Sequence, residues 1–437
     1  MIALTNARIG EISPASIRDS LDVIIEGTTI KEVGRGIAGK HSPDVEIDCT
    51  GKLIMPGFVC GHNHFYSGLA RGMLADIPPS PDFVSHLQNL WWRLDRALDG
   101  ESVAAGALIC CLEAIAAGTT AVIDHHSSQS CIEGSLDILE AAFEQTGLRG
   151  VLCFETTDRN GREGMIAGVE ENLRFAGKRG KNRPGGTGIP LTAAMIGGHA
   201  PFTLSDEALK LLGGAVEDTG LGFHLHCAED RFDPSHSHAV YGRDIIKRLD
   251  DYGLITGRTL IAHGLYLREE EIDYLNERGS FLAHNPRSNM NNTVGYNHHL
   301  PRYSGAVLGT DGMGSDMLEE LKFAFFKHQD AGGPLAPEDF TRFLFNGNRI
   351  LESSFTERFG RIEPGCAADM VIAAYRSPTP LTAENLSGHM IFGMSSKDIE
   401  TVLVNGKIVY RDRRFPGDVE DIYRRAREAA ESLWREL

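Results

Sequence analysis

The chain lacks the features of a protein that binds nucleic acid or a membrane. Its 437 residues contain 43 Lys and Arg against 60 Asp and Glu, which gives a net charge of −17. Because a phosphate backbone is bound by clustered basic side chains, this excess of acid argues against a nucleic-acid partner, and it also disfavours an anionic membrane surface. No apolar run reaches about 18 residues, so we expect no transmembrane helix.

Other signals are missing as well. The first residues, MIALTNARIGEI, have no basic stretch followed by an apolar one, so we expect no signal peptide. The eight cysteines show no C-x-x-C spacing and lie mostly in apolar runs, which is typical of buried free thiols in a reducing cytoplasm. The motifs G-x-S-x-G, H-E-x-x-H and H-x-E…P-C-x-x-C are absent, which disfavours serine hydrolases, metalloproteases of that type and the small zinc nucleobase deaminases.

Short apolar runs in the middle of the chain stop at residues that can bind a metal. These residues are His62 and His64 in PGFVCGHNHFYSG, His226 and Glu229 in FHLHCAED, His263 in LIAHG and Asp311 in GAVLGTDG. Residues i and i+2 of an extended chain point to the same side, so His62 and His64 can face one ion. Histidine nitrogens with an aspartate are ligands that suit one divalent metal with an open position for water.

The same region alternates between strand-length apolar runs and helical stretches. The expected strands are 57–62, 119–124, 149–155, 190–197, 221–226, 258–263, 279–284 and 305–311. One expected helix, in LSDEALKLLGGAVEDTG, has Ser205 as its candidate N-cap. Eight strands that alternate with helices predict a (β/α)8 barrel, whose active site lies at the carboxyl ends of its strands.

Both chain ends have the alternation and turn residues of β-structure. We expect residues 1–56 and 364–417 to form one small β-sandwich, with a hairpin at Asn405-Gly406. Residues 57–363 would then form the barrel and residues 418–437 a surface helix. The predicted fold class is therefore α/β: a (β/α)8 TIM barrel with a small β-sandwich domain formed by both chain ends.

Taken together, these motifs resemble the amidohydrolase superfamily over nearly the whole chain. PGFVCGHNH resembles its H-x-H motif, HLHCAED its H-x-x-E motif, AHG the next strand's histidine, GTDG its final metal-binding aspartate, and GCAADMVIA its returning strand. GHAPFTLSD and HNPRSNMNN resemble the mononuclear aminohydrolases, the branch of the cytosine, guanine, 8-oxoguanine and S-adenosylhomocysteine deaminases and the triazine hydrolases. CGHNHFYSGLARG, NLWWRLDRALD, CFETTDRNG and VGYNHHL look closer still to the aminohydrolases called SsnA, a name that does not define a substrate.

The resemblance implies a set of roles. It makes His62, His64, His226 and Asp311 the ligands of one divalent metal, zinc in the first place, with iron or manganese as alternatives. The expected fourth strand ends IGGHAP and has no lysine there, whereas binuclear members carry a carboxylated lysine at that place, so one metal is expected rather than two. The implied catalytic residues are Asp311, which accepts a proton from water, Glu229, which protonates the ring nitrogen, and His263, which stabilises the developing charge.

Four further residues are expected to bind the substrate because they follow barrel strands or lie in the long excursion after the first strand. These residues are Trp92, Glu155, Arg159 and His199. Glu155 and Arg159 could bracket the donors and carbonyls of a heterocycle, and Trp92 could stack on a flat ring. The alternatives are an ordinary charged loop for the first two and helix packing for the tryptophan.

The sequence therefore predicts a cytoplasmic, metal-dependent aminohydrolase that deaminates a small heterocycle such as a purine or pteridine. The alternative is hydrolytic ring opening of a cyclic amide in purine catabolism, because the same metal site can serve that bond. Loss of another leaving group, such as chloride, and a scaffold without catalytic activity are less favoured. The family resemblance also implies a homodimer or a larger homo-oligomer, and neither nucleic acid nor a membrane is an expected partner.

Overall fold

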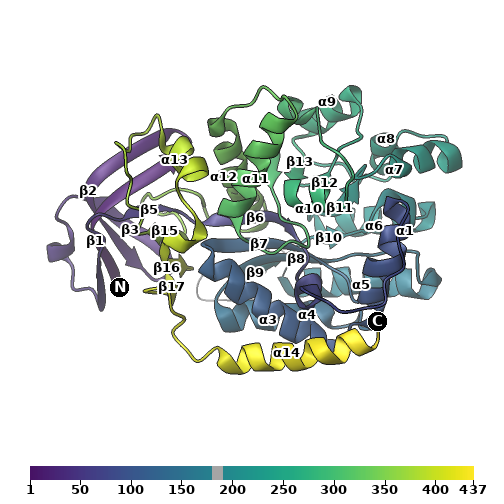
Figure 1. Ribbon diagram of the computed structural model, residues 1–437, viewed down its shortest axis with the longest axis horizontal. Coiled ribbons are helices and arrows are strands. Elements are labelled where there is room, and N and C mark those ends of the chain that lie inside the picture. The colour runs from purple at the N-terminus through teal and green to yellow at the C-terminus, as the bar shows by residue number, and fades with distance from the viewer. Residues whose placement is uncertain (180–189) are drawn as a thin grey trace.

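The computed structural model describes residues 1–179 and 190–437, and its centre is a TIM barrel (Figure 1). All barrel strands pair in parallel, in one sheet of four and one of five strands. The strands are β6 (Phe58–Asn63), β7 (Thr119–His126), β8 (Arg149–Phe154), β9 (Thr192–Ala194), β10 (Ile196–Gly197), β11 (Phe223–Cys227), β12 (Leu260–His263), β13 (Phe281–His284) and β14 (Ala306–Leu308). Every expected barrel strand is thus present, and the fourth is divided into β9 and β10.

The two sheets meet at two seams. At the first, the chain changes partner at Met195, because Met195 N donates to Leu152 O of β8 at 3.0 Å whereas Ile196 N donates to Gly222 O, just before β11, at 2.9 Å. At the second, the carbonyl oxygen of His62 accepts the backbone N–H groups of Thr310 and Asp311 at 2.9 and 3.0 Å. These hydrogen bonds bring the end of the last strand beside the first.

The barrel interior is apolar below the strand ends and polar at them. Inward-facing residues of seven strands form one buried cluster, which includes Val59, Ala121, Ile123, Val151, Ala193, Leu260, Ala262, Ala283 and Val307. Because side chains alternate along a strand, the next inward position of β7 after Ile123 is His125. The apolar floor therefore carries a layer of histidines directly above it.

Helices cover the outside of the barrel. The longer ones are α3 (Gly100–Ala116), α4 (Ser135–Thr146), α5 (Gly161–Arg179), α6 (Asp206–Thr219), α9 (Glu269–Arg278), α11 (Met317–Asp330) and α12 (Pro337–Ser354). The shorter ones include α7 (Phe232–His236), α8 (Ile245–Asp250) and α10 (Pro286–Asn291). The N-cap expected for α6 is confirmed, since the Ser205 hydroxyl accepts the Ala208 N–H at 3.2 Å. An excursion after β6 forms α1 (Phe83–His86), a π-helical turn (Leu87–Trp91) and α2 (Trp92–Ala97).

The strands of both chain ends share one sheet, at the left of Figure 1, in the order β17-β16-β15-β5-β1-β2-β3 with β4 beside β1. They are β1 (Ile2–Ile12), β2 (Ala15–Glu26), β3 (Thr29–Gly34), β4 (Val45–Asp48), β5 (Leu53–Pro56), β15 (Met370–Ala373), β16 (Ile399–Val404) and β17 (Lys407–Tyr410). One half of β1 pairs with β4 and the other with β5, so the sheet closes over a core of its own. The predicted hairpin is confirmed, with φ of 54° at Asn405 and 70° at Gly406. The predicted domain boundaries stay predictions.

A buried ion pair joins the barrel to this terminal sheet. The guanidinium of Arg149, at the start of β8, donates to both carboxylate oxygens of Asp369, just before β15, at 2.6 and 3.0 Å. The rings of Phe355 and Phe359 lie 5.1 and 5.0 Å from the guanidinium. The Asp369 carboxylate also accepts the backbone N–H of Asn405 in the hairpin, so one side chain ties three segments together.

Two helices complete the chain. The short α13 (Leu386–Phe392) lies between β15 and β16, and α14 (Glu420–Arg435) runs along α3 at the bottom of Figure 1. The buried face of α14 carries Ala426, Ala429 and Leu433, as expected of an amphipathic surface helix in this segment. Among the residues that the structure describes, none of the helices is long and apolar enough to cross a membrane.

Candidate active site

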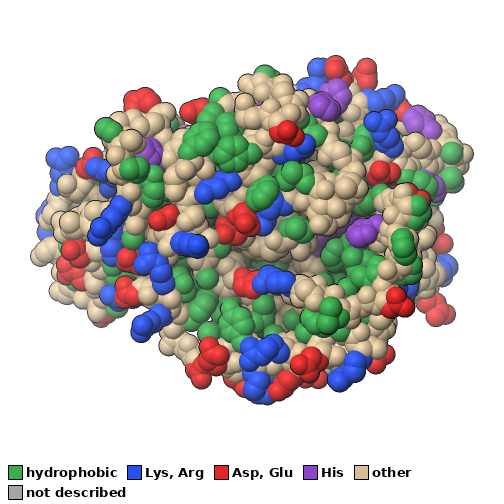
Figure 2. Space-filling model, in the orientation of Figure 1, with side chains coloured by type: hydrophobic (Ala, Val, Ile, Leu, Met, Phe, Trp, Pro, Cys, Tyr) green, Lys and Arg blue, Asp and Glu red, His purple; other side chains and the backbone are tan. Residues whose placement is uncertain are grey.

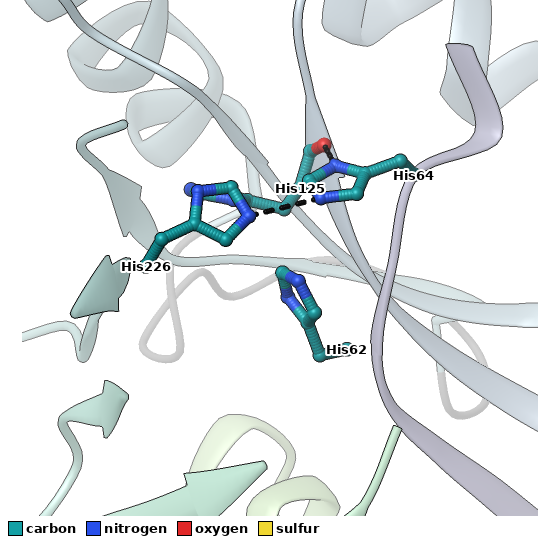
Figure 3. A group of neighbouring side chains, drawn as sticks. All are labelled: His62, His64, His125 and His226. Atoms are coloured by element: carbon teal, nitrogen blue, oxygen red, sulfur yellow. Dashed lines mark hydrogen bonds between the residues drawn. The ribbon is translucent and has the colours of Figure 1, made fainter. Parts of the chain in front are cut away.

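The predicted metal ligands meet at the carboxyl ends of the barrel strands, where all four are buried. The Nε2 atom of His64 lies 3.0 Å from Nε2 of His226 and 2.7 Å from Oδ1 of Asp311. Nε2 of His62 lies 3.3 Å from the same carboxylate oxygen. Figure 3 shows the rings of His62, His64 and His226 gathered around one space, together with His125. Strands far apart in the sequence thus supply one compact group of nitrogen and oxygen atoms.

The hydrogen bonds that the histidines make through Nδ1 determine which ring nitrogens can bind a metal. Nδ1 of His64 donates to the His125 carbonyl oxygen at 2.6 Å, and Nδ1 of His226 donates to the His199 carbonyl oxygen at 3.0 Å. A neutral imidazole that donates from Nδ1 has a bare lone pair on Nε2. The two Nε2 atoms therefore face each other at 3.0 Å, an arrangement that a cation between them would relieve. Although burial opposes it, Asp311 and Glu155 raise the pKa of His64 well above its ordinary value, so either a proton on this ring or a metal ion can supply the positive charge.

His62 is held in a similar way, but by a side chain. Its Nδ1 shares a hydrogen bond of 2.9 Å with Nε2 of His224, and its Nε2 is buried without a hydrogen-bond partner in the part of the chain that the structure describes. Burial lowers the pKa of His62 to about 3, although Asp311 opposes the shift. Burial also lowers the pKa of His226 well below the ordinary value, with a further contribution from His64. Both rings are therefore neutral, the form in which histidine binds a metal.

The predicted catalytic residues surround the same point. Nδ1 of His263 donates to Oδ1 of Asn289 at 2.8 Å, while its Nε2 lies 3.4 Å from Oε2 of Glu229 and 3.9 Å from Oδ2 of Asp311. The hydroxyl of Ser288 donates to that same oxygen of Asp311. The three predicted side chains therefore face one another across a single small space.

The two carboxyl groups of this site differ in their affinity for a proton. Burial raises the pKa of Glu229 to about 7; the charge of Asp311 adds to the shift and His263 opposes it. Although burial opposes it, the neighbouring His64 and His62 lower the pKa of Asp311 well below its ordinary value. One carboxyl can thus hold a proton at neutral pH while the other is ionised, the division of labour that acid–base catalysis needs.

Three residues at the site have left-handed backbone conformations that glycine adopts more easily. The φ angles are 50° at Ala228, next to Glu229, 74° at His263 and 53° at Asp311. Such conformations cost energy in residues with a Cβ atom and concentrate at functional sites. Here they turn the chain at the strand ends, where the side chains face the metal-competent group.

A cleft of about 830 Å³ opens above the histidines, and all four predicted substrate residues line it. Its other walls include Phe83, Leu87 and Trp91 from the excursion after β6 and Phe202 from the loop after β10. Figure 2 shows hydrophobic side chains around a hollow near α1, with a histidine visible inside it. This volume includes the mouth of the cleft, which opens to solvent.

Glu155 is the deepest of these four residues, at 1% exposure. Its Oε1 lies 3.2 Å from Nδ1 of His64 and 3.4 Å from Nδ1 of His125, and its Oε2 lies 3.9 Å from Nε2 of His199. Burial raises the pKa of Glu155, against the opposing effect of His64. This carboxyl therefore connects the predicted metal ligands with the wall of the cleft.

Arg159 and Trp92 lie together on another wall. The guanidinium of Arg159 is centred 4.7 Å from the Trp92 ring and donates to the carboxylate of Asp95 at 2.8 Å. The Trp92 ring in turn lies 6.3 Å from the ring of His199. Asp95, which the sequence patterns did not single out, comes from α2 and is 2% exposed. In the sequence, the only indication of a role for Asp95 was that it lies close to Trp91 and Trp92 in the long excursion after the first barrel strand.

His125 is a second residue to which the sequence analysis assigned no role. Two adjacent histidines cannot both point inward, and the structure has His125 inside while Nε2 of His126 contacts the Ser128 hydroxyl at 2.9 Å. Neither ring nitrogen of His125 has a hydrogen-bond partner among the described residues. Its ring atoms lie within 4.8 Å of those of His62, His64 and His226, so the metal-competent group is larger than the predicted ligand set.

Comparison with known proteins shows the family of the chain. The model of the amidohydrolase family matches residues 53–409. A 5-methylthioadenosine/S-adenosylhomocysteine deaminase of Pelotomaculum thermopropionicum is 31% identical over 405 residues, which are 90% of this chain and 89% of the relative. A 5'-deoxyadenosine deaminase of Methanothermobacter thermautotrophicus is 32% identical over 401 residues, or 89% of each chain.

Solved structures share the fold. The crystal structure of an adenosine deaminase from Xanthomonas campestris, with bound zinc, has a TM-score of 0.85 and 24% identity over 100% of this chain and 99% of the other. The match to the family model spans most of the chain, and the predicted histidines and aspartate lie at the strand ends of the barrel. The chain therefore belongs to the amidohydrolase family, as a hydrolase of carbon–nitrogen bonds other than peptide bonds.

Proposed function

We propose that this enzyme deaminates an adenosine-like nitrogen heterocycle with the help of one divalent metal. The observation that carries the proposal is that Glu229 and Asp311 lie 3.4 and 3.9 Å from Nε2 of His263, beside the imidazoles of the predicted ligands. Burial raises the pKa of Glu229 to about 7, whereas His64 and His62 lower that of Asp311 although burial opposes it, which supports an acid and a base at one site. Hydrolytic removal of an amino group needs both an acid and a base at one carbon atom. The adenosine-type substrates named for the two relatives support the choice of ring.

The residues fit a divalent metal. Nε2 of His64 faces Nε2 of His226 at 3.0 Å, and Nε2 of His62 is buried without a hydrogen-bond partner among the described residues. The carboxylate of Asp311 lies within 3.3 Å of His62 and His64. We propose these four residues as ligands of Zn²⁺, which favours nitrogen with some oxygen donors, with Fe²⁺ or Mn²⁺ as alternatives. When bound, such an ion supplies the Lewis acidity that makes water nucleophilic near neutral pH.

The side chains then move the protons. Asp311, held by the Ser288 hydroxyl, accepts a proton from the attacking water. Glu229, oriented by Asn292 Nδ2 at 3.2 Å, protonates the ring nitrogen next to the attacked carbon. His263, held by Asn289, stabilises the charge that develops at the attacked carbon. The proton on Asp311 passes to the amino group, the carbon–nitrogen bond breaks, and ammonia leaves. The proton of the added hydroxyl returns to Glu229, so the ring carries a carbonyl oxygen and both carboxyl groups regain their starting protonation.

The substitution Glu229→Gln tests this assignment. We expect turnover to fall by about 10²- to 10⁴-fold, the usual contribution of a general acid, while metal content stays unchanged because Glu229 is not a proposed ligand. Ammonia release and bound metal should be measured together, with Glu217→Gln on the outer face of α6 as the control. Retained turnover would show that another group donates the proton.

The spectrum of the product distinguishes the two reactions that the site can perform. Ammonia release with a shifted but surviving ring absorbance would identify deamination. Loss of the ring absorbance without ammonia would instead indicate ring opening of a cyclic amide, the alternative reaction. A panel of purines, pteridines, pyrimidines and triazines with zinc-reconstituted protein covers the rings that the family resemblance suggests.

The metabolic role, the cellular location and the oligomeric state of the enzyme stay predictions. We propose a role in purine metabolism and a cytoplasmic location, on the basis of the substrate class and of the eight free cysteines. We also propose a homodimer or larger homo-oligomer, which rests on family resemblance. Sedimentation analysis of the purified protein would decide the oligomeric state.

A further inference from the structure

His62 differs from the other two predicted histidine ligands in the group that contacts its Nδ1 atom. His64 and His226 direct Nδ1 to backbone carbonyl oxygens, which can only accept a hydrogen bond. Nδ1 of His62 instead lies 2.9 Å from Nε2 of His224, and an imidazole nitrogen can either donate or accept. The contact with His224 is therefore compatible with both neutral tautomers of His62.

Only one of these tautomers can bind a metal at the predicted site. Nε2 of His62 is the ring nitrogen that faces this site, 3.3 Å from Oδ1 of Asp311. If Nε2 carried the proton, the lone pair would be on Nδ1 and the ring could not be a ligand from that side. His62 and His224 are both at 0% exposure, so bulk water does not select the tautomer and the protein must do so.

The hydrogen bonds continue from His224 to a thiol and end at a backbone carbonyl group. Nδ1 of His224, on β11, lies 3.7 Å from Sγ of Cys153, on β8. The same Sγ donates to the carbonyl oxygen of Asp124, on β7, at 3.7 Å. Both contacts are long because sulfur is a large atom and a weak hydrogen-bonding partner. Three neighbouring strands thus contribute to one buried hydrogen-bond chain that leads to His62.

The carbonyl oxygen determines the direction of every bond in this hydrogen-bond chain. A carbonyl oxygen only accepts, so the single proton of the Cys153 thiol points to Asp124. The sulfur then has only lone pairs to offer His224, whose Nδ1 must donate and whose Nε2 must accept. Nδ1 of His62 therefore donates to that Nε2, and Nε2 of His62 has a bare lone pair.

Packing holds the rings in the planes that these hydrogen bonds need. The ring of His125 stacks on that of His224, with centroids 4.3 Å apart and an angle of 23° between the planes. The ring of His62 stands at 73° to that of His224. All three rings are buried at the strand ends, where neighbouring side chains restrict their rotation, so the arrangement is preorganised.

The same residues could also be interpreted as a second metal site. Ligand atoms of His125, Cys153 and His224 lie within 4.8 Å of one another. A metal there would need the lone pair of His224 Nδ1, which is the atom that carries the proton in the hydrogen-bond chain. Its binding would reverse the bond to His62 and place a proton on the nitrogen that faces the first site. The two sites therefore exclude each other.

We propose that His224 and Cys153 are positioning residues, which hold His62 in the tautomer that a metal requires. His224 acts on His62 directly, and Cys153 acts through His224, with the Asp124 carbonyl as the fixed end. The inference rests on the proposed function, because His62 is one of the ligands proposed there. It adds to that function two side chains that contact neither the substrate nor the ion.

The affinity of the protein for Zn²⁺ tests the role of His224 without any need for turnover. It should be measured by competition with a chromophoric chelator. His224→Phe keeps a ring but removes the acceptor, and we expect the affinity to fall by roughly 10- to 100-fold, as it does when a metal-bound histidine loses its outer partner. His224→Gln should recover most of this loss, because its amide oxygen can accept the Nδ1–H of His62.

Two substitutions of Cys153 and one control complete the series. Cys153→Ala should weaken zinc binding less than His224→Phe does, and Cys153→Ser should leave it unchanged because a hydroxyl also donates and accepts. His126→Phe is the matched control, since it makes the same replacement at a buried histidine of β7 that contacts Ser128 instead. We expect the control to keep the zinc affinity of the wild type.

The tautomer can also be observed directly, in metal-free protein that contains ¹⁵N-labelled histidine. The nuclear magnetic resonance signal of His62, assigned by its loss in His62→Gln, should be that of a ring with the proton on Nδ1. A proton on Nε2 of His62, or an unchanged zinc affinity in His224→Phe, would overturn the proposal. If that variant fails to fold, the comparison of Cys153→Ala with Cys153→Ser and the tautomer in the wild type decide the question.

Failure of the proposed function would look different. A wild-type protein that binds no zinc would count against the proposed metal site, whereas the tautomer of His62 in the metal-free protein would still support or overturn the role of His224. Zinc binding that is equally tight in every variant would overturn the positioning role and leave the metal site intact.

Discussion

The buried ion pair between Arg149 and Asp369 allows a quantitative prediction about stability. The substitution Asp369→Asn keeps the shape of the side chain but removes its charge. The carboxylate accepts three N–H groups, two from Arg149 at 2.6 and 3.0 Å and one from the Asn405 backbone at 2.6 Å. An amide has one acceptor oxygen in place of two, so at least one of these donors loses its partner and the guanidinium loses its counter-charge.

The expected cost is large because Arg149 has no access to water, at 0% exposure. Removing one partner of a buried ion pair destabilises a protein by about 3–5 kcal/mol. With an unfolding entropy of about 2.1 cal/mol/K per residue, a chain of 437 residues should show a Tm lower by roughly 4 °C. Replacing both partners, as Arg149→Met with Asp369→Leu, should recover most of the loss, since no charge is then left unpaired.

Urea unfolding and thermal denaturation of the variants would measure these changes. The matched control is Glu428→Gln, which removes an ion pair with Arg424 on the surface of α14, where both side chains are more than half exposed. Exposed pairs of this kind contribute little. The reasoning would be refuted if Asp369→Asn lowered stability no more than Glu428→Gln, or if raised salt abolished its effect, because buried pairs are poorly screened.

Three further predictions concern the site and its scaffold. Burial and Asp311 raise the pKa of Glu229 to about 7 against the effect of His263, so the proton that Glu229 must donate is present below that pH and lost above it. We therefore expect kcat/KM to fall as the pH rises above about 7. A kcat/KM that stays constant up to about pH 9 would contradict the role of Glu229 as the acid. Ser205→Ala should lower the free energy of unfolding by about 1 kcal/mol, measured in urea, because the Ala208 N–H loses its cap. Removal of metal by a chelator should lower Tm, and added zinc should restore it in a concentration-dependent way; a Tm indifferent to both would speak against a metal site.

Much of the barrel could be predicted from the sequence because its strands are short, uniformly apolar and end at polar residues. His62, His64, His226 and His263 were visible for that reason, since each follows an apolar run at the point where a parallel strand must stop. The division of the fourth strand at Met195 could not be seen, because the change of partner is made by backbone hydrogen bonds that any residue can form.

The walls of the cleft were harder to predict. Arg159 follows a barrel strand and was singled out, but its partner Asp95 lies 64 residues away in a helical excursion with no periodic pattern to place it. The positive φ angles of His263 and Asp311 could not be predicted either, because glycine is the residue from which such a conformation is usually inferred in a sequence. Local patterns therefore identified residues along the strands, whereas contacts between separate loops needed the structure.

The seam at which the His62 carbonyl accepts the N–H groups of Thr310 and Asp311 has a consequence for biosynthesis. The first proposed ligand leaves the ribosome early, but the aspartate that completes the proposed set follows about 250 residues later, and contacts of such long range are slow to form. A growing chain therefore offers histidines but no finished coordination sphere until its last barrel strand has docked. A metal bound by the proposed ligands would therefore stabilise only those chains in which the barrel has closed.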